Sequence, residues 1–300
     1  GVVTSIHFGA RRIIEKIEIS VEDKKPKSYK SFSSSELNAA DREAVMKNIL
    51  DACIFPLIRQ RPFNKVANPN DVPRDIFVSA YNTAPLSVNV SKVIQNNKDQ
   101  FQAGLTALSK LTDGSVYLTS QKLMEFDNAT NITIEGPHPA GNVGIQIHHI
   151  KPINPGEVIW TVNAQHVITI GKLFQNGQYD PGCIVSIGGS GSSNPQTVRA
   201  LTGSSIGSLL KDQLLNGSQR IISGDVLTGK RVSSDDYLGY YDSSVAIIND
   251  DVKRPFLGML AFGSSSTKYS LTNTFLSSGI KEFDFTTSQN GELRAIVPLN

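Results

Sequence analysis

The stretch with the greatest chemical potential is EGPHPAGNVGIQIHHI, residues 135–150, which holds three histidines among glycines and prolines. Clustered histidines bind a metal ion when their side chains converge. His148 and His149 are adjacent, so on a helix or strand they point in different directions, and Glu135 is the one carboxylate close by. With His166 as a distant fourth histidine, the sequence predicts no metal site.

The same stretch is a poor phosphate-binding loop. Pro137 and Pro139 each remove a backbone N–H donor, and the three glycines are five and three residues apart instead of in Gly-x-Gly-x-x-Gly spacing. We expect a rigid loop at the carboxyl end of a strand, which is the edge where ligands bind in open α/β sheets. His138, held between the two prolines, is the candidate ligand contact in that loop.

A second glycine-rich stretch, VSIGGSGSSNPQ at 185–196, could form an anion-binding nest, although a turn in a small domain is the simpler interpretation. Ser190 lies between two glycines but lacks the Gly-x-Ser-x-Gly spacing that exposes a hydrolase nucleophile. The sequence therefore indicates no catalytic residue.

The stretch PLIRQRPFNKV at 56–66 places Arg59, Arg61 and Lys65 beside Phe63. Such a pattern could bind an anionic ligand or the acidic surface of a partner. A solvated cationic edge is an equal alternative. Phe63 is kept as a candidate contact residue.

Composition limits the partners and the cofactors. The chain has 29 basic and 27 acidic residues, a net charge of +2, which is far from the basic excess of a nucleic-acid-binding protein. We expect no nucleic-acid partner. Cys53 and Cys183 are too few for an iron–sulfur cluster or a zinc knuckle. No run of about 18 or more apolar residues occurs that would cross a membrane.

The middle of the chain alternates between strand and helix patterns. A buried strand is predicted at 74–81, and two further strands are predicted at 115–120 and 131–137. Helices are predicted at 34–54, 91–111 and 156–177. Ser35 or Asn38 would cap the first helix, Trp160 would lie on the apolar face of the last, and Gly177 would end it. This alternation favours a parallel sheet covered by helices on both faces.

The expected fold class is α/β plus α+β. From about residue 180 the pattern changes to short strands, glycine turns and one helix near Ser205, which is typical of a small α+β unit. The predicted boundaries are a two-stranded segment at 1–23, a linker at 24–35, an α/β domain at 36–180, an α+β domain at 181–250 and strands and loops at 251–300. Two strands cannot bury a face alone, so we expect a fragment of a longer protein.

Several long stretches together resemble one protein family. They are FPLIRQRPFNKVANPNDVPRDIFVSAYNTAPL, EGPHPAGNVGIQIHHIKPIN, WTVNAQHVITIGKLF and YLGYYDSSVAII. They are similar to the A subunit of the bacterial Na⁺-translocating NADH:quinone oxidoreductases, and the resemblance covers nearly the whole chain. It implies a remnant of a biotinyl-like β barrel at 1–23, a Rossmann-like parallel-sheet domain at 36–180 and a soluble ligand-binding β-grasp domain at 181–250.

The resemblance also implies a function. The complex would be a translocase that uses NADH, flavins, iron–sulfur clusters and quinone. This chain would be a peripheral, cofactor-free subunit without catalytic activity of its own. Its partners would be the other subunits, especially a membrane subunit, together with ubiquinone or menaquinone. Its place would be the cytoplasmic face of the bacterial inner membrane.

This family is in turn similar to the flavin- and NADH-binding subunit of respiratory complex I, and the departures from that relative are informative. Where the relative has a glycine-rich flavin-phosphate loop after the first helix, this chain has IFPLIRQRPFN. Where it has acidic residues after the next strand, this chain has SAYNTAPL. We expect side chains of residues 55–63 and 79–86 to fill the flavin space, so no cofactor-binding residue is predicted.

Two alternatives remain open at this point. The chain could be a quinone-binding module in its own right, since quinones favour apolar walls with one or two hydrogen-bond donors. The candidate quinone or partner contacts are Phe63, Tyr81, Pro137, His138 and Pro139. A flavin-dependent NADH dehydrogenase domain is the weaker alternative, because it requires a glycine loop that the sequence lacks.

Overall fold

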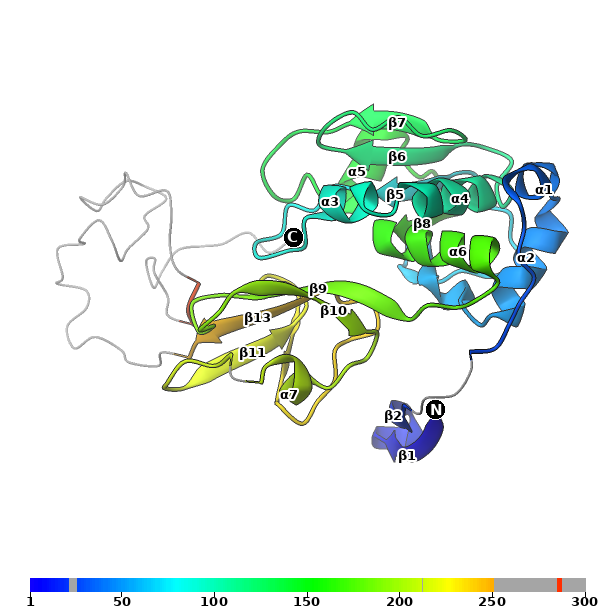
Figure 1. Ribbon diagram of the computed structural model, residues 1–300. Helices are drawn as coiled ribbons and strands as arrows, with labels where there is room; N and C mark the ends of the chain where they lie inside the picture. The colour runs from blue at the N-terminus through cyan, green and yellow to red at the C-terminus, as the bar shows by residue number, and fades with distance from the viewer. Residues whose placement is uncertain (22–25, 212, 251–284, 288–300) are drawn as a thin grey trace.

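The computed structural model describes residues 1–21, 26–211, 213–250 and 285–287 (Figure 1). Within these residues the chain forms an N-terminal hairpin, a six-stranded sheet with helices, and a five-stranded sheet. The coarse expectation of a mixed α/β protein is therefore confirmed. The strands and loops expected at 251–300 lie outside the described residues, except for 285–287.

The hairpin pairs β1 (Val2–Phe8) with β2 (Ile14–Ser20) in antiparallel register through a short turn, η1 (Ala10–Arg12), as the sequence predicts.

Farther along, part of the segment predicted as a linker is packed against a helix. The backbone N–H of Tyr29 donates to the Gly177 carbonyl at 2.7 Å, and that of Phe32 donates to the Phe174 carbonyl at 2.7 Å. Phe32 is buried.

The six-stranded sheet has the order β4-β3-β8-β5-β6-β7. Strands β8, β5, β6 and β7 are parallel, whereas β3 is antiparallel to both of its neighbours, β4 and β8. The bounds are β3 Ile58–Arg61, β4 Lys65–Val66, β5 Ile76–Ser79, β6 Val116–Ser120, β7 Thr130–Thr133 and β8 Ile159–Asn163.

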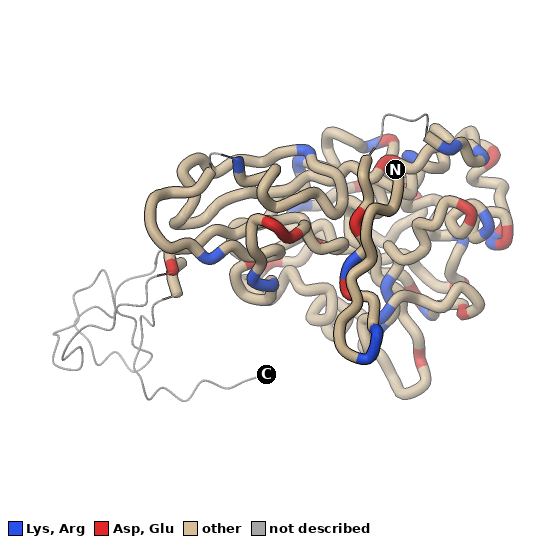
Figure 2. The backbone as a smooth tube through the Cα atoms, turned by 90° about the horizontal axis from the view of Figure 1, so that it is seen from below, with Lys and Arg blue, Asp and Glu red and all other residues tan. Residues whose placement is uncertain are grey.

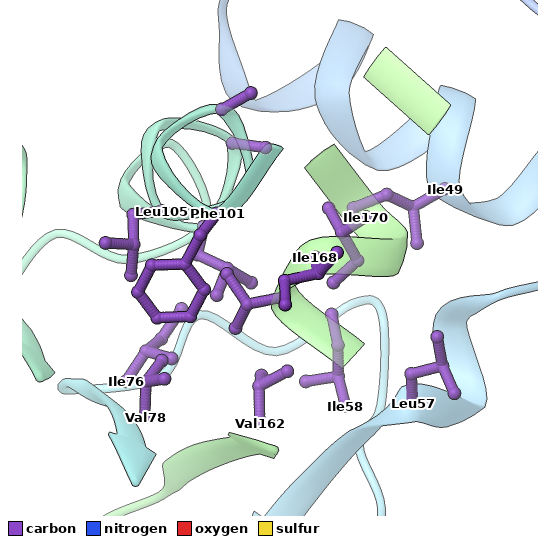
Figure 3. Close-up of a cluster of buried hydrophobic side chains, with 14 of the residues drawn as sticks. Ile49, Leu57, Ile58, Ile76, Val78, Phe101, Leu105, Val162, Ile168 and Ile170 are labelled. Atoms are coloured by element: carbon purple, nitrogen blue, oxygen red, sulfur yellow. The ribbon is translucent and has the colours of Figure 1, made fainter. Parts of the chain in front are cut away.

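Helices cover both faces of this sheet. They are α1 Ser34–Ala39, α2 Arg42–Asp51, α3 Val90–Gln95, α4 Lys98–Ser109, α5 Val143–Ile150 and α6 Ala164–Asn176, with the 3₁₀ turn η2 at Phe55–Leu57. Along β5, Ile76 and Val78 join the larger core with α4 and α6 (Figure 3). Phe77, between them, joins the smaller core with Ile147 of α5. The alternation of side chains along a strand produces these two cores.

Helices α4 and α6 lie unusually close together because glycines face each other at their crossing. A Cβ on Gly171 would lie 1.7 Å from the Gln100 carbonyl oxygen, and one on Gly104 would lie 2.1 Å from the Val167 carbonyl oxygen. No larger side chain fits at either position without separating the helices. The two helices therefore form one tight layer, with α6 over β5 and β8 and α4 over β6.

Two of the three predicted helices are each divided into two helices, and the prediction of the third is partly wrong. Helix 34–54 is α1 and α2, capped by Ser33 and Asp41 instead of Ser35 or Asn38, and helix 91–111 is α3 and α4. The first half of predicted helix 156–177 is strand β8, which contains Trp160. A parallel strand buried on both faces has a continuous apolar run, which resembles a buried helix in sequence. Gly177 ends α6 with φ of 65°, as expected.

The five-stranded sheet has the order β10-β9-β13-β11-β12, with β13 parallel to β9 and the other pairs antiparallel. The bounds are β9 Gly182–Gly188, β10 Gln196–Leu201, β11 Gln219–Ser223, β12 Lys230–Val232 and β13 Ser244–Asn249, with one short helix, α7, at Ile206–Leu209. Its core gathers Val185, Ile206 and Ile247. This sheet and its helix form the small domain.

The small domain contacts the larger one through Tyr241. Its hydroxyl donates to the Pro56 carbonyl at 2.9 Å and accepts from Arg59 Nη1 at 2.9 Å, while the Arg59 guanidinium lies 4.5 Å from the ring centroid. The ring of His166 in α6 meets Tyr241 edge to face at 6.1 Å. Burial lowers the pKa of His166 to about 4, and its hydrogen bond with the Leu57 backbone opposes that shift only in part.

A buried carboxylate joins elements at the amino edge of the parallel strands. Asp75 is fully buried and accepts from Arg74 Nε at 2.7 Å, Lys151 Nζ at 2.8 Å and the Ser115 backbone N–H at 3.1 Å. Burial raises the pKa of Asp75, but the hydrogen bonds from Lys151, Ser115 and Arg74 outweigh it and hold the pKa below its ordinary value. The carboxylate thus ties the start of β5 to the end of α5 and to β6.

The substitution Asp75→Asn should lower the free energy of unfolding by about 3 kcal/mol, because it leaves two cations facing a neutral amide in a buried setting. Urea denaturation measures this. Asp51→Asn is the matched control, since Asp51 forms an exposed pair with Lys47 on α2 and should cause no measurable change. Equal effects of the two substitutions would contradict the structural role of Asp75.

Protonation of His166 should weaken the folded state as the pH falls from 6.5 toward 5. In this window the unfolded chain takes up a proton that folded His166, with a pKa of about 4, does not. The free energy of unfolding should therefore fall with pH, by at most about 1.4 kcal/mol per pH unit from this group. His166→Gln should flatten the slope in urea denaturation, whereas His148→Gln on the exposed face of α5 should not.

Candidate functional site

The candidate site is the carboxyl edge of the parallel strands, between the loop that follows β5 (80–89) and the loop that follows β7 (134–142). The chain moves to β6 after β5 but to the other side of β5 after β7, so the strand order reverses between β5 and β8. Open α/β sheets bind ligands at such a point. Of the predicted contacts, Tyr81, Pro137, His138 and Pro139 lie in these two loops.

The two loops are bonded directly to each other. The Tyr81 hydroxyl donates to the Gly136 carbonyl at 3.0 Å. The Thr83 hydroxyl accepts from the Gly141 backbone N–H at 2.9 Å and lies 3.1 Å from His138 Nδ1. The backbone N–H of Gly141 is thereby engaged and faces the protein instead of an open cradle.

Beneath the loops, the side-chain amide of Gln146 closes the edge. Gln146 is 1% exposed. Its Oε1 accepts from the Thr119 hydroxyl of β6 at 2.7 Å, and its Nε2 donates to Ser79 Oγ of β5 at 3.0 Å and to the Ala140 carbonyl at 3.2 Å. These bonds hold the start of α5 against the ends of two neighbouring strands.

Packing at the edge leaves no room for a ligand between the loops. A Cβ on Gly141 would lie 2.4 Å from the Thr83 backbone nitrogen, so the two loops touch at backbone distance. An open phosphate-binding loop has unpaired N–H groups around an empty concavity. Here the corresponding space is filled by the loops themselves.

The segment after the first long helix is also filled. Where a flavin-phosphate loop would need free N–H groups, η2 follows α2 with Pro56 inside it. Phe55 and Leu57 are buried, and the ring of Phe55 packs edge to face on Trp160 at 5.8 Å. A flavin phosphate does not fit the residues present at this position.

The cavities near these elements do not suit a flavin or a nucleotide either. The cavity between the domains, beside His166 and Tyr241, has a volume of about 20 Å³, which is enough for about one water molecule. A larger groove of about 520 Å³ lies between α1 and α4, and it is lined by Asp99 and Asp127. Two carboxylates repel a phosphate group, so this groove is not a nucleotide site.

Phe63 lies apart from the other predicted contacts. It occupies the turn between β3 and β4 and is 82% exposed. Because β3 is antiparallel to β8, with Arg61 opposite Ile159, this turn lies at the amino edge of the parallel strands. Tyr81 and His138 lie at the carboxyl edge, so the structure does not form a single slot from the three residues.

His138 is half-buried, whereas Pro137 and Pro139 are exposed. Burial raises the pKa of Asp225, in the loop after β11, but hydrogen bonds from Thr228 and Leu227 hold it below its ordinary value. In its protonated form, the His138 imidazole adds to that lowering of the Asp225 pKa. The loop after β7 and the loop after β11 are therefore electrostatic neighbours.

The described part of the chain has neither a metal-binding cluster nor a membrane-spanning helix. There, no group of three or more His, Cys, Asp and Glu side chains converges on a point that could hold a metal ion. No helix among the same residues is long and apolar enough to cross a membrane. Acidic and basic residues are interspersed along the described backbone (Figure 2).

Sequence reasoning missed the residues that close the edge. Gln146 stands out in the sequence as a polar residue between Ile145 and Ile147, within a short apolar helix. Ser79 and Thr119 end or nearly end two adjacent buried strands. Polar residues at adjacent strand ends are the signal that could have identified this network.

The substitution Gln146→Leu should lower the free energy of unfolding by about 1–3 kcal/mol, because it leaves the buried hydroxyl of Thr119 and the half-buried hydroxyl of Ser79 without this partner. Urea denaturation measures the change. Gln95→Leu, at the exposed end of α3, is the matched control and should have little effect. An unchanged midpoint for Gln146→Leu would show that the amide does not hold the edge together.

Comparisons with known proteins place the chain in a family. A family model described as the NqrA second alpha/beta domain matches residues 40–179, and one described as the NQRA C-terminal domain matches residues 184–234. A chain from NAD⁺-reducing NiFe-hydrogenase in the H₂-reduced state is similar with a TM-score of 0.47 and 13% identity, over 75% of this chain and 52% of that one.

Relatives named as the A subunit of Na(+)-translocating NADH-quinone reductase match the whole chain. The protein of Saccharophagus degradans is 36% identical over 307 residues, and that of Pasteurella multocida is 36% identical over 306 residues. Each match covers 100% of this chain and 68% of the relative. The predicted resemblance is thus confirmed, and the chain belongs to the NqrA family, the A subunits of the Na⁺-translocating NADH-quinone reductases.

Proposed function

We propose that this chain is a peripheral, redox-silent subunit of a Na⁺-translocating NADH-quinone reductase. In that complex, other subunits carry electrons from NADH to quinone, while this chain supplies architecture. The observation that supports this role most directly is the closed carboxyl edge, where Gln146 bridges the ends of β5 and β6 beside the point at which the strand order reverses, and Gly141 contacts Thr83. A sheet edge filled by its own side chains suits a scaffold better than a cofactor site.

The fold expected from the family is part of the same proposal. The parallel order β8-β5-β6-β7 with helices on both faces supports a Rossmann-like domain. The order β10-β9-β13-β11-β12, with its central strands parallel and one helix, supports a β-grasp domain. The N-terminal hairpin would then be the remnant of the biotinyl-like barrel.

A flavin phosphate does not fit the loop after α2, so we assign no electron-transfer step to this part of the chain. The loop after α2 has buried Phe55 and Leu57 where phosphate donors are needed. The subunits that oxidise NADH and reduce quinone would be separate chains. We place this chain on the cytoplasmic face of the bacterial inner membrane, bound to the other subunits and above all to a membrane subunit.

A quinone contact at the mouth of the closed edge is the second candidate, and the geometry of His138 favours it. Among the described residues, the Thr83 hydroxyl accepts from the Gly141 N–H and contacts His138 Nδ1. Donation of the hydroxyl proton to Nδ1 leaves the His138 proton on Nε2. That N–H would be available to a carbonyl oxygen of ubiquinone or menaquinone, beside the exposed ring of Pro137.

Titration of the chain with FMN, NADH and a short-chain ubiquinone should separate these roles. We expect no FMN or NADH binding in isothermal titration calorimetry up to about millimolar concentration, where association is worth only about 4 kcal/mol. Stoichiometric FMN uptake, with the absorbance of a bound flavin, would contradict the redox-silent role.

The ubiquinone arm tests the second candidate with a matched pair of variants. Saturable binding that is lost in His138→Phe and kept in His149→Phe would support a quinone contact at the mouth. His149 is exposed on α5 and is outside the loop. Equal binding by both variants, or none by the unmodified chain, would remove the quinone contact and leave the scaffold role intact.

A further inference from the structure

The turn between β3 and β4 is an exposed aromatic tip. Phe63 is 82% exposed, and Val66 beside it in β4 is 42% exposed. The β3–β4 hairpin lies at one side of the six-stranded sheet, since β4 ends the strand order. A phenyl ring this exposed contributes little to the fold of the chain, so it is accessible to another molecule.

Arg59 fixes the shape of this tip. Its guanidinium donates to the Asn64 backbone carbonyl and lies 3.5 Å from Asn64 Oδ1. It also donates to the Tyr241 hydroxyl at 2.9 Å. Asn64 has a left-handed φ of 47°, which asparagine tolerates better than most residues. The tip is therefore ordered before any partner arrives, which lowers the entropic cost of binding.

The hairpin carries positive charge without local compensation. Arg61 is half-buried, and its Nε has no hydrogen-bond partner. Burial and the neighbouring Arg59 lower the pKa of the Arg61 guanidinium. Among the described residues, neither Arg61 nor Lys65 has a carboxylate within ion-pair distance. An acidic group from outside that pairs with Lys65 and with the accessible part of the Arg61 guanidinium would offset the repulsion between the arginines.

From this geometry we propose that the β3–β4 hairpin is a docking tip that inserts Phe63 into an apolar recess of another protein subunit, with acidic side chains at its rim that pair with Arg61 and Lys65. The inference rests on the proposed function, because it names a partner contact of a peripheral subunit. Aromatic residues and arginines together dominate the binding energy of protein interfaces. The hairpin presents both types on a rigid turn.

A membrane surface suits the hairpin less well than a protein does. One phenyl ring buries little apolar area in a bilayer, and stable peripheral attachment needs two strong membrane signals. Arg59 is already bonded to Asn64 and Tyr241, and Arg61 is half-buried, so only Lys65 is fully free to meet lipid phosphates. The partly buried Arg61 is better matched by a carboxylate at fixed geometry.

The test is site-specific photo-crosslinking in the assembled complex. A photoreactive benzoylphenylalanine replaces Phe63, and the purified complex is irradiated and analysed by mass spectrometry. Leu123 is the control position, because it is 63% exposed and lies in the loop after β6. That loop is at the carboxyl edge of the parallel strands, whereas Phe63 is at their amino edge. We expect a crosslink from position 63 to one other subunit, near Asp or Glu residues, and at least tenfold less of that product from position 123.

Each other outcome overturns the docking inference. A crosslink from position 63 to lipid alone would assign the tip to the membrane, and the absence of any crosslink in an intact complex would show that the tip is free. The proposed function fails differently: the unmodified chain would then not purify with the other subunits at all. Unmodified chain that co-purifies but yields no crosslink at position 63 would remove only this inference.

Two variants measure the contribution of the tip to assembly. Phe63→Ser should reduce retention of the chain on the detergent-solubilised complex at least tenfold, while thermal unfolding of the free chain stays the same because Phe63 makes no core contact. Lys65→Glu should weaken retention and reduce its dependence on salt. Leu123→Ser should leave retention unchanged. Retention of both hairpin variants at the unmodified level would contradict the docking role.

Discussion

The carboxyl edge of the large sheet depends on the hydrogen bonds of the Gln146 side-chain amide. It is buried, so each of its polar groups needs a partner, and the strand ends supply them at Thr119 and Ser79. With that amide in place, the loop before α5 has one position, and Gly141 meets Thr83 at backbone distance. An edge that commonly receives a cofactor is here completed by the chain itself.

The contact between the two domains also includes hydrogen bonds. Tyr241 joins the Pro56 carbonyl and the Arg59 guanidinium, and Ser186 Oγ donates to the Leu86 carbonyl at 2.6 Å. These contacts are polar, and Leu86 adds an apolar one, because it packs against the cluster of Ile222, Ala246 and Ile248. Arg59 takes part in both the domain contact and the β3–β4 turn. A single guanidinium therefore bonds to the small domain through Tyr241 and to the exposed tip through Asn64.

The sequence predicted the chain's regular elements better than their arrangement. Strand 115–120 was identified because its apolar residues are compact and bounded by turns. Trp160 was assigned to a helix because burial on both faces of β8 removes the alternation that marks a strand. Phe63 was grouped with Tyr81 because neither residue type nor spacing reveals that β3 runs antiparallel to β8. Gln146 was overlooked because its partners are 27 and 67 residues away in the chain.

The central position of β13 has a consequence for how the protein is made. The ribosome releases the chain from its amino end, and domains fold as their last essential segment emerges. The six-stranded unit is complete once α6 ends at Asn176. The small sheet can form only after Ser244–Asn249 has been synthesised. This segment is β13, which lies between β9 and β11 and joins the β9–β10 pair to the β11–β12 pair. During synthesis, the β9–β10 pair thus lacks its neighbour β13 while the large domain is already complete. Tyr241 can contact the large domain in its final position only when β13 has been made.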